Sequence, residues 1–226
     1  MTNREWAKDA THRVGLEIKR LRGERKVQWL SDRTAELGHR VGRSRISDLE
    51  RGDRGGVLDI AELVVLARAL GVPPLQLLFP IGREAMTEVL PGAVVPTWPA
   101  AKWFTNEGAF PEALRDGGWG ASTEDMNAWK AGVPLKFRKL DGLYKQWSAA
   151  RGEVQRARFE ASEATTPKAR EDALSRLELA EERLRRAEDA VRNYREYIRQ
   201  LELNPGDLSP EFAYIDEAPD GTGTDR

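Results

Sequence analysis

Arginine and lysine side chains are concentrated in one stretch of the sequence, residues 13–54, where 12 of them stand against 7 Asp and Glu residues. Guanidinium and ammonium groups bind phosphate oxygens through charge and hydrogen bonding, so this surplus of five positive charges favours docking of a polyanion. The whole chain has a net charge of -1, and residues 204–226 hold six acidic residues and one basic residue. The positive potential is therefore local to the N-terminal part.

Other reactive groups are scarce in this sequence. It has no cysteine, and His12 and His39 are its only imidazoles, which excludes disulfides, thiolate metal sites and a His-based catalytic zinc site. The HExxH spacing of zinc peptidases is absent as well. We expect no enzyme activity, no catalytic residue, no metal and no cofactor.

The composition favours an all-α protein with long solvated faces. Hydrophobic residues make up 40% of the 226 residues, charged residues make up 32%, and the mean hydropathy is -0.60. No apolar run approaches the roughly 18 to 20 residues that span a bilayer, and the first residues lack the apolar core of a secretory signal. We expect a cytoplasmic protein without membrane contact.

The first part of the chain, residues 1–82, is expected to form a domain of five short helices. Apolar residues recur at steps of three and four, glycines follow the second and third helices, Asp59 is placed to cap the fourth, and prolines open the fifth. The first three helices are expected at residues 4–25, 27–37 and 43–51.

Residues 27–53, VQWLSDRTAELGHRVGRSRISDLERGD, combine two short helices around a tight connection. Leu30 and Ala35 lie in the first helix, Gly38 at the turn, and Ile46 and Leu49 on the inner side of the second helix, which closes with Glu-Arg-Gly. In this order the residues resemble the lambda-repressor-like (Xre/Cro-type) helix-turn-helix family of DNA-binding regulators. The resemblance covers about a third of the chain and extends through ELVVLARALGVPPLQLLF. The connection GHRVG is longer than the tightest form of the family.

The resemblance implies a recognition helix at residues 43–51 that enters the major groove of double-stranded DNA. Arg43 is then placed to donate two hydrogen bonds to guanine O6 and N7, with Ser44 and Ser47 as further base contacts. The expected phosphate contacts lie around the two helices and are Lys26, Gln28, Arg40, Arg45, Arg51 and Arg54. Glu50 is expected to be structural, paired with an internal arginine such as Arg33.

Residues 83–133 are rich in proline and aromatic residues and are expected to form a connector. WPAAKWF and STEDMNAWKA each predict one short helix, the second capped by Ser122 or Thr123. The rest of the connector is expected to be ordered loop.

Residues 134–204 are expected to form a long antiparallel helical hairpin, a coiled coil. Two seams of apolar residues alternate at three and four residues on either side of a loop that contains Pro167. The first seam holds Leu140, Leu143, Trp147, Ala150, Val154, Ala157, Ala161 and Ala164, and the second holds Ala173, Leu177, Ala180, Leu184, Ala187, Val191, Tyr194, Ile198 and Leu201. Residues 205–226 have the composition of an acidic, disordered tail.

Apolar residues also lie off these two seams, at Phe137, Tyr144, Phe159, Leu174, Leu179 and Tyr197. They predict a partner surface, for which a second copy of the chain is the favoured occupant, since the family's readers recognise paired half-sites. A protein partner and the aromatic connector itself remain alternatives.

We therefore expect a DNA-binding transcriptional regulator, a repressor of the kind that phages and prophages carry being one form. The alternatives are a coiled-coil adaptor that its N-terminal domain localises to DNA, and an antitoxin or restriction-modification controller. A self-cleaving Ser-Lys domain would require a strand-rich C-terminal half, which the sequence does not predict. The operator, the regulated genes and the sign of the regulation are not encoded in any motif that we identify.

Overall fold

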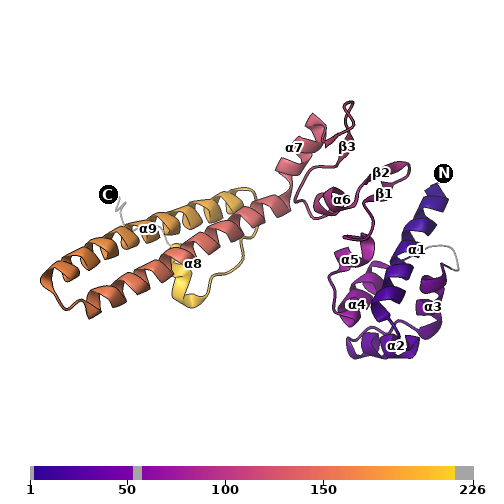
Figure 1. Cartoon of the computed structure of the whole chain (residues 1–226), viewed down its shortest axis with the longest axis horizontal. Helices are drawn as coiled ribbons and strands as arrows, with labels where there is room; N and C mark the ends of the chain where they lie inside the picture. The colour runs from indigo at the N-terminus through magenta and orange to yellow at the C-terminus, as the bar shows by residue number, and fades with distance from the viewer. Residues whose placement is uncertain (1–2, 53–57, 217–226) are drawn as a thin grey trace, which may run out of the picture. The chain divides into compact units, whose positions relative to one another are not determined.

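The computed structural model describes residues 3–52 and 58–216 of the chain and is mostly helical (Figure 1). It divides into two compact units, Met1–Ala131 and Gly132–Arg226. None of the helices in the described ranges is long and apolar enough to cross a bilayer.

Five helices open the first unit, namely α1 (Asn3–Arg22), α2 (Val27–Glu36), α3 (Arg43–Arg51), α4 (Ile60–Leu70) and α5 (Pro74–Leu78). The five predicted helices are confirmed, although α1 ends earlier than expected, at Arg22, where Gly23 follows with a φ of 60°. Glycine adopts this left-handed conformation without steric cost and so ends the helix.

The capping of α4 follows the expectation for Asp59. Its carboxylate accepts a hydrogen bond from the Ala61 amide at 2.6 Å, and the Glu62 side chain reaches back to the Asp59 amide, so the two residues form a capping box. Gly71 closes the helix in the left-handed conformation. These signals fix both ends of α4, which packs against α2 and α5.

The five helices enclose one apolar core, to which each of them contributes at least one buried side chain. A continuous core of this kind fixes the relative positions of the short helices, none of which has enough surface to be stable alone. Its buried residues are Val14, Ile18, Leu30, Val41, Ile46, Leu49, Leu66, Ala67, Ala69 and Leu77.

The connector contains two small antiparallel hairpins that the sequence analysis did not predict. Strand β1 (Met86–Leu90) pairs with β2 (Ala93–Pro96), and β3 (Glu112–Ala113) pairs with β4 (Trp119–Gly120). Short strands beside prolines carry too weak an alternation to be recognised in sequence. The two predicted short helices are present as α6 (Thr97–Phe104) and α7 (Thr123–Ala131).

The connector has its own small core, in which Phe79 and Val95 pack with two alanines of α6. Asn106 ties it to α7, since its amide donates to the Trp129 carbonyl at 3.1 Å and the Trp129 indole donates to the Asn106 carbonyl at 3.2 Å. Ser122 caps α7 as predicted, by accepting a hydrogen bond from the Asp125 amide at 3.0 Å.

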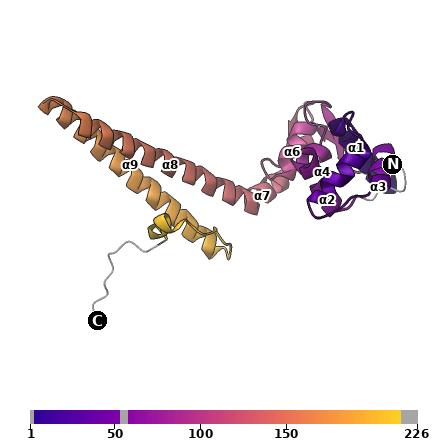
Figure 2. The same ribbon diagram turned by 90° about the horizontal axis from the view of Figure 1, so that it is seen from below.

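The second unit is built on two long helices, α8 (Val133–Glu163) and α9 (Pro167–Gln200), which lie side by side and run antiparallel (Figures 1 and 2). At 1.5 Å per residue, 31 and 34 residues give lengths of about 46 and 51 Å. The residues buried between the helices belong to the two predicted seams, with Arg195 as the exception. They are Leu140, Trp147, Ala150, Val154, Ala157, Ala173, Ala180, Val191 and Ile198.

The expectation of a disordered tail from residue 205 is wrong for residues 205–216. A short 3-10 helix, η1 (Pro210–Ile215), packs against α9, and Ile215 is fully buried. The aromatic ring of Phe212 and the carboxylate of Asp216 supply contacts that the acidic composition of the tail concealed. Residues 217–226 lie outside the described ranges.

Of the apolar residues predicted off the seams, four are more than two-fifths exposed, and these are Phe159, Leu174, Leu179 and Tyr197. Phe137 is half-buried. Tyr144 is half-buried too, because it packs in the cluster that Phe212 and Ile215 complete. The C-terminal segment therefore covers part of the surface that the sequence analysis assigned to a partner.

Candidate nucleic-acid interface

The connection between α2 and α3 is held in place by a buried threonine. The Thr34 hydroxyl donates to the Ser31 carbonyl at 2.8 Å and accepts from the Val41 amide at 2.9 Å, while Val41 itself is buried in the core. Gly38 supplies the positive φ, 85°, that the turn after α2 requires. The longer connection thus has a defined path, and α3 begins at a fixed point.

The inner side of α3 is fixed by apolar contacts and by one buried ion pair. Ile46 and Leu49 are buried, and Arg22 of α1 grips both carboxylate oxygens of Glu50 at 2.7 and 2.8 Å. The hydrogen bond to Glu50 raises the pKa of Arg22 above its usual value. Both side chains are almost buried, so each charge is compensated by the other.

Glu50 is structural, as expected, but the partner expected for it was wrong. Arg33 pairs with Glu36 at 2.6 Å on the surface of α2 and does not reach Glu50. Arg22 lies one helical turn after the buried Ile18, on the face of α1 that meets the core. That spacing is the signal in the sequence that identifies Arg22 as an inward-facing arginine.

Helices α1 and α3 are in close backbone contact at Gly15. A Cβ atom added at this glycine would lie 1.8 Å from the carbonyl oxygen of Leu49, which is backbone and has no freedom to move aside. Only glycine permits this contact. The sequence analysis did not single out Gly15, which holds α3 against α1 and so determines where its outer face points.

The outer face of α3 carries the three residues predicted to contact bases. Arg43 and Ser44 are exposed in the first turn, and Ser47 is half-buried one turn later. Arg43 makes no hydrogen bond or ion pair with any residue of the ranges 3–52 and 58–216, and its side chain is exposed. The structure brings the three side chains to the N-terminal half of one short helix.

Arg45, which was expected to contact phosphate, is engaged inside the protein. Its Nε donates to Oε1 of Glu62 at 2.8 Å and its Nη2 to Oε2 at 2.7 Å, and the hydrogen bonds to Glu62 raise its pKa. Because Glu62 also caps α4, this pair ties α3 to the start of α4. The side chain is directed by an internal partner.

Two other predicted phosphate contacts share one acidic partner on α2. Gln28 donates to Oδ1 of Asp32 at 2.7 Å, and Nη1 of Arg40 lies 3.4 Å from the same oxygen. The Arg40 and Asp32 side chains are both about half exposed, so this pair is weak in water.

The remaining predicted phosphate contacts lie at the ends of α2 and α3. Lys26 is exposed at the residue before α2, and Arg51, in the last turn of α3, is paired with Asp48 at 2.7 Å while its side chain stays 56% exposed. Arg54 lies outside the described residues. Of the predicted phosphate contacts in the described ranges, Gln28, Arg40, Arg45 and Arg51 have acidic neighbours that the sequence analysis did not include.

No cluster of His, Asp and Glu side chains with the geometry of a metal site occurs in residues 3–52 and 58–216. Comparisons with protein-family models, with curated proteins and with solved structures find no match to this chain.

Proposed function

We propose that the chain is a sequence-specific regulator that binds double-stranded DNA, with α2 and α3 as a helix-turn-helix of the lambda-repressor-like type and α3 as the recognition helix. The observation that carries the proposal is the contrast between the two sides of α3. Its inner side is fixed by Ile46, by the Arg22–Glu50 pair and by the approach at Gly15. Its outer side presents Arg43 and Ser44 to solvent.

In this proposal Arg43 reads a guanine through two hydrogen bonds, to O6 and N7, and Ser44 makes a less selective contact with the neighbouring base. Ser47 lies one turn further along and contacts a base only where the groove allows close approach, since its side chain is half-buried. A helix fixed on its inner side loses little conformational entropy on binding, which favours selectivity for one sequence.

Lys26, Gln28, Arg40 and Arg51 are proposed to hold phosphates on either side of the reading helix, together with Arg54. Neither α2 nor α3 has a side-chain cap at its N-terminus among the described residues, so first-turn amides are available to phosphate oxygens. Arg45 is reassigned from phosphate contact to positioning, because Glu62 holds it against α4.

The two long helices α8 and α9 are proposed to be a coiled coil that brings two copies together in the cytoplasm. Helix-turn-helix dimers bind half-sites about one helical turn apart, roughly 34 Å along the DNA. Exposed apolar residues on the hairpin, among them Phe159 and Leu179, support a role in association. Repression follows if the bound dimer blocks a promoter.

The second candidate is an adaptor, in which the hairpin binds another protein and the N-terminal domain only localises it to DNA. The same exposed apolar residues favour it. An adaptor requires no strong base preference, whereas a repressor does. A third candidate is an antitoxin or a restriction-modification controller. The identity of the neighbouring genes would distinguish it from the other two.

Selection of binding sites from a random pool of DNA duplexes by the full-length chain tests the proposal. We expect enrichment of one sequence, with binding that weakens steeply as salt rises. Arg170→Ala, which removes a charge from α9, is the charge-matched control for Arg43→Ala and should leave the selected sequence unchanged. Binding of equal strength to all duplexes would refute sequence-specific recognition.

A further inference from the structure

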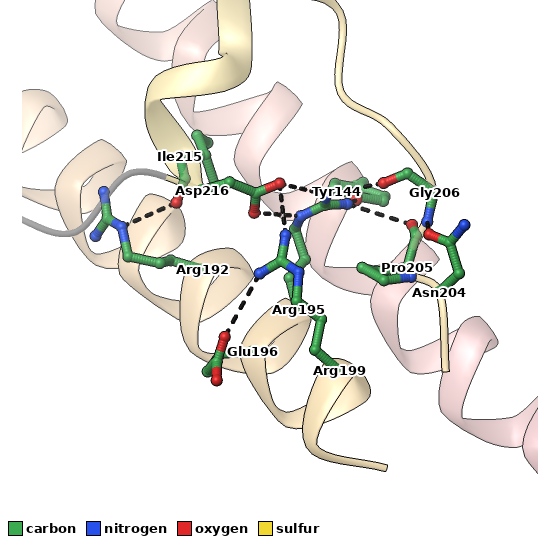
Figure 3. Close-up of polar contacts among 10 residues, drawn as sticks. All are labelled: Tyr144, Arg192, Arg195, Glu196, Arg199, Asn204, Pro205, Gly206, Ile215 and Asp216. Atoms are coloured by element: carbon green, nitrogen blue, oxygen red, sulfur yellow. Dashed lines mark hydrogen bonds and ion pairs between the residues drawn. The ribbon is translucent and has the colours of Figure 1, made fainter. Parts of the chain in front are cut away.

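Arg195 of α9 is 1% exposed and is held by several hydrogen bonds (Figure 3). Its Nε and Nη2 donate to the two carboxylate oxygens of Asp216 at 2.7 and 2.5 Å. Its Nη1 donates to the Tyr144 hydroxyl at 2.5 Å, and its Nη2 also donates to the Gly206 carbonyl at 2.8 Å. All three nitrogen atoms of the guanidinium are thus used to hold residues from outside α9.

Two further arginines on the same side of α9 also bind the C-terminal segment. Nη2 of Arg199 lies 2.6 Å from Asp216, and Arg192 donates from Nε to the carbonyl of Ile215 at 3.0 Å. The hydrogen bonds from Arg195, with Arg199 adding to them, lower the pKa of Asp216 to about 2. The carboxylate is therefore charged at neutral pH and is paired with the guanidinium groups of Arg195 and Arg199.

Aromatic packing completes the site. The rings of Phe212 and Trp147 meet edge to face with centroids 4.8 Å apart, and the Arg151 guanidinium lies 4.2 Å from the Phe212 ring. Tyr214 donates its hydroxyl hydrogen to Glu188 at 2.5 Å, and burial together with this bond raises the pKa of Tyr214 to about 12. Residues 208–216 are thus held like a bound peptide, by apolar anchors and by charge.

The chain reaches this site through a strained reversal just after α9. Glu202 has a φ of 58°, and the amides of Glu202 and Leu203 donate to the carbonyls of Arg199 and Ile198 at 2.8 and 3.2 Å. Glycine normally occupies this position after a helix, because the left-handed conformation is sterically unfavourable for residues that have a Cβ atom. The return of the segment to its own hairpin therefore depends on one unfavourable residue.

We propose that the site on α8 and α9 takes residues 205–216 of a second copy, so that two chains pair by exchanging their C-terminal segments. An exchanged segment makes the same contacts as the returning one, and opening the reversal releases the strain at Glu202 in both chains. Because the carbonyls of Pro205 and Gly206 already belong to the site, only residues 202–204 connect α9 to the exchanged segment, and they span about 10 Å when extended. The exchange therefore requires that the C-terminal ends of the two α9 helices lie next to each other.

The exchange supplies a specific form for the pairing of copies in the proposed function, and to that extent it rests on that proposal. Each site is completed by Asp216 and Phe212 of the other chain. The partner is a second copy because the site matches the segment that fills it in side-chain size, charge and backbone hydrogen bonds.

Two substitutions of the exposed Glu202 in the full-length chain test the exchange. Glu202→Gly removes the strain and favours return to the same hairpin, whereas Glu202→Val keeps the amide donor but resists a positive φ and favours opening. We expect the Val variant to dimerise on the order of 30-fold more tightly than the Gly variant, with the natural chain between them. Analytical ultracentrifugation without DNA across micromolar concentrations measures this difference.

Asp216→Lys in each Glu202 background is the control for the site. It places a cation against Arg195 and should leave every variant monomeric with the α8 and α9 helicity intact by circular dichroism. A Val variant that stays dimeric with Asp216→Lys, or equal masses for the Gly and Val variants, overturns the exchange. If Glu202→Val reduces the helix content, the masses of the natural chain and of Glu202→Gly are compared instead. Equal masses for these two proteins would also overturn the exchange.

Failure of the exchange and failure of the proposed function are distinguishable. Site selection is carried out with the natural chain and with Glu202→Gly, whose reading helix is unchanged. Enrichment of one DNA sequence by the natural chain, with no difference in dimerisation between the Gly and Val variants, contradicts the exchange alone. Absence of enrichment by the natural chain contradicts the proposed function, whatever the ultracentrifugation shows.

Discussion

The two units bring helices together in different ways. In the first unit, α1 meets α3 backbone to backbone at Gly15, where a Cβ atom would lie 1.8 Å from the Leu49 carbonyl oxygen. In the second unit, α8 and α9 share a seam of small and branched residues, and a Cβ atom at Gly142 would meet nothing within 4 Å. The contact at Gly15 leaves no room for a side chain, whereas α8 and α9 meet through side chains and Gly142 lies beside their seam.

The difference corresponds to what each unit is proposed to do. A reading helix must be held at a fixed position and angle, so that Arg43 reaches one base edge. A hairpin that brings copies together needs length and a surface, which a repeated seam provides. A side chain added at Gly15 should therefore be severely destabilising, and one added beside the seam, at Gly142, should be tolerated.

The largest effect is expected for Gly15→Ala. Its Cβ would overlap backbone atoms of Leu49, so α1 and α3 must separate at a cost of about 4 kcal/mol or more in the free energy of unfolding. Gly142→Ala is the matched control and should stabilise α8 by up to about 1 kcal/mol. Chemical denaturation followed by circular dichroism measures both. Similar behaviour of the two variants would remove the contrast between the units.

Glu50→Gln comes next. It leaves the almost buried Arg22 guanidinium without a compensating charge and should cost about 3 kcal/mol in the stability of the first unit. Arg33→Gln, which affects only a surface pair with Glu36, is the control and should cost less than about 1 kcal/mol. Equal losses in the two variants would show that the inner side of α3 is not held by this ion pair.

Asp216→Asn should lower the free energy of docking of the C-terminal segment by about 2 kcal/mol. This value lies between the loss expected for an exposed ion pair and that for a buried one, because the segment can undock and expose Arg195 to water. The folded pKa of Asp216, about 2, lies below its ordinary value of 3.8, so the stabilisation is complete at neutral pH and is lost as the pH falls from about 4 through 2. Hydrogen exchange of the amides of residues 210–216 reports the undocking. Protection unchanged by pH or by the substitution would contradict the role of the carboxylate.

The smallest effect is expected for Arg40→Ala, which removes one proposed phosphate contact. All DNA sequences should be bound less tightly by a similar factor, and the slope of the logarithm of affinity against the logarithm of salt concentration should fall by about one unit. Titrations at several salt concentrations with the selected duplex and a scrambled one provide the comparison. A loss of affinity for only one of the two duplexes would indicate that Arg40 contacts a base and not a phosphate.

The sequence was sufficient to predict the elements whose signals are local. The bounds of α3 were predicted because a connection ending in Gly42 precedes it and Gly52, in the left-handed conformation, follows it. The two seams of the hairpin were predicted from their spacing, and Asp59 from its place before an apolar run. Each of these signals lies within about one helical turn of the feature it specifies.

Contacts between distant residues were not predictable in the same way. Arg22 and Glu50 are 28 residues apart, and Arg195 and Asp216 are 21 residues apart, so no spacing marks them as pairs. The acidic composition of the tail indicated disorder, whereas Arg195 and Arg199 of α9 bind the carboxylate of Asp216 and Arg192 binds the backbone carbonyl of Ile215. The short strands β1 and β2 were missed because their apolar residues form no clear alternation.

The most direct test of the central claim compares base preferences of the natural chain and of Arg43→Ala. We expect Arg43→Ala to bind the selected site about 1 to 3 kcal/mol more weakly and to lose preference at one base pair, because one bidentate contact with guanine is lost. Arg170→Ala, with the same change in charge, should retain both the affinity and the preference. Selection of the same site by Arg43→Ala with unchanged affinity would contradict the assignment of α3 as the recognition helix.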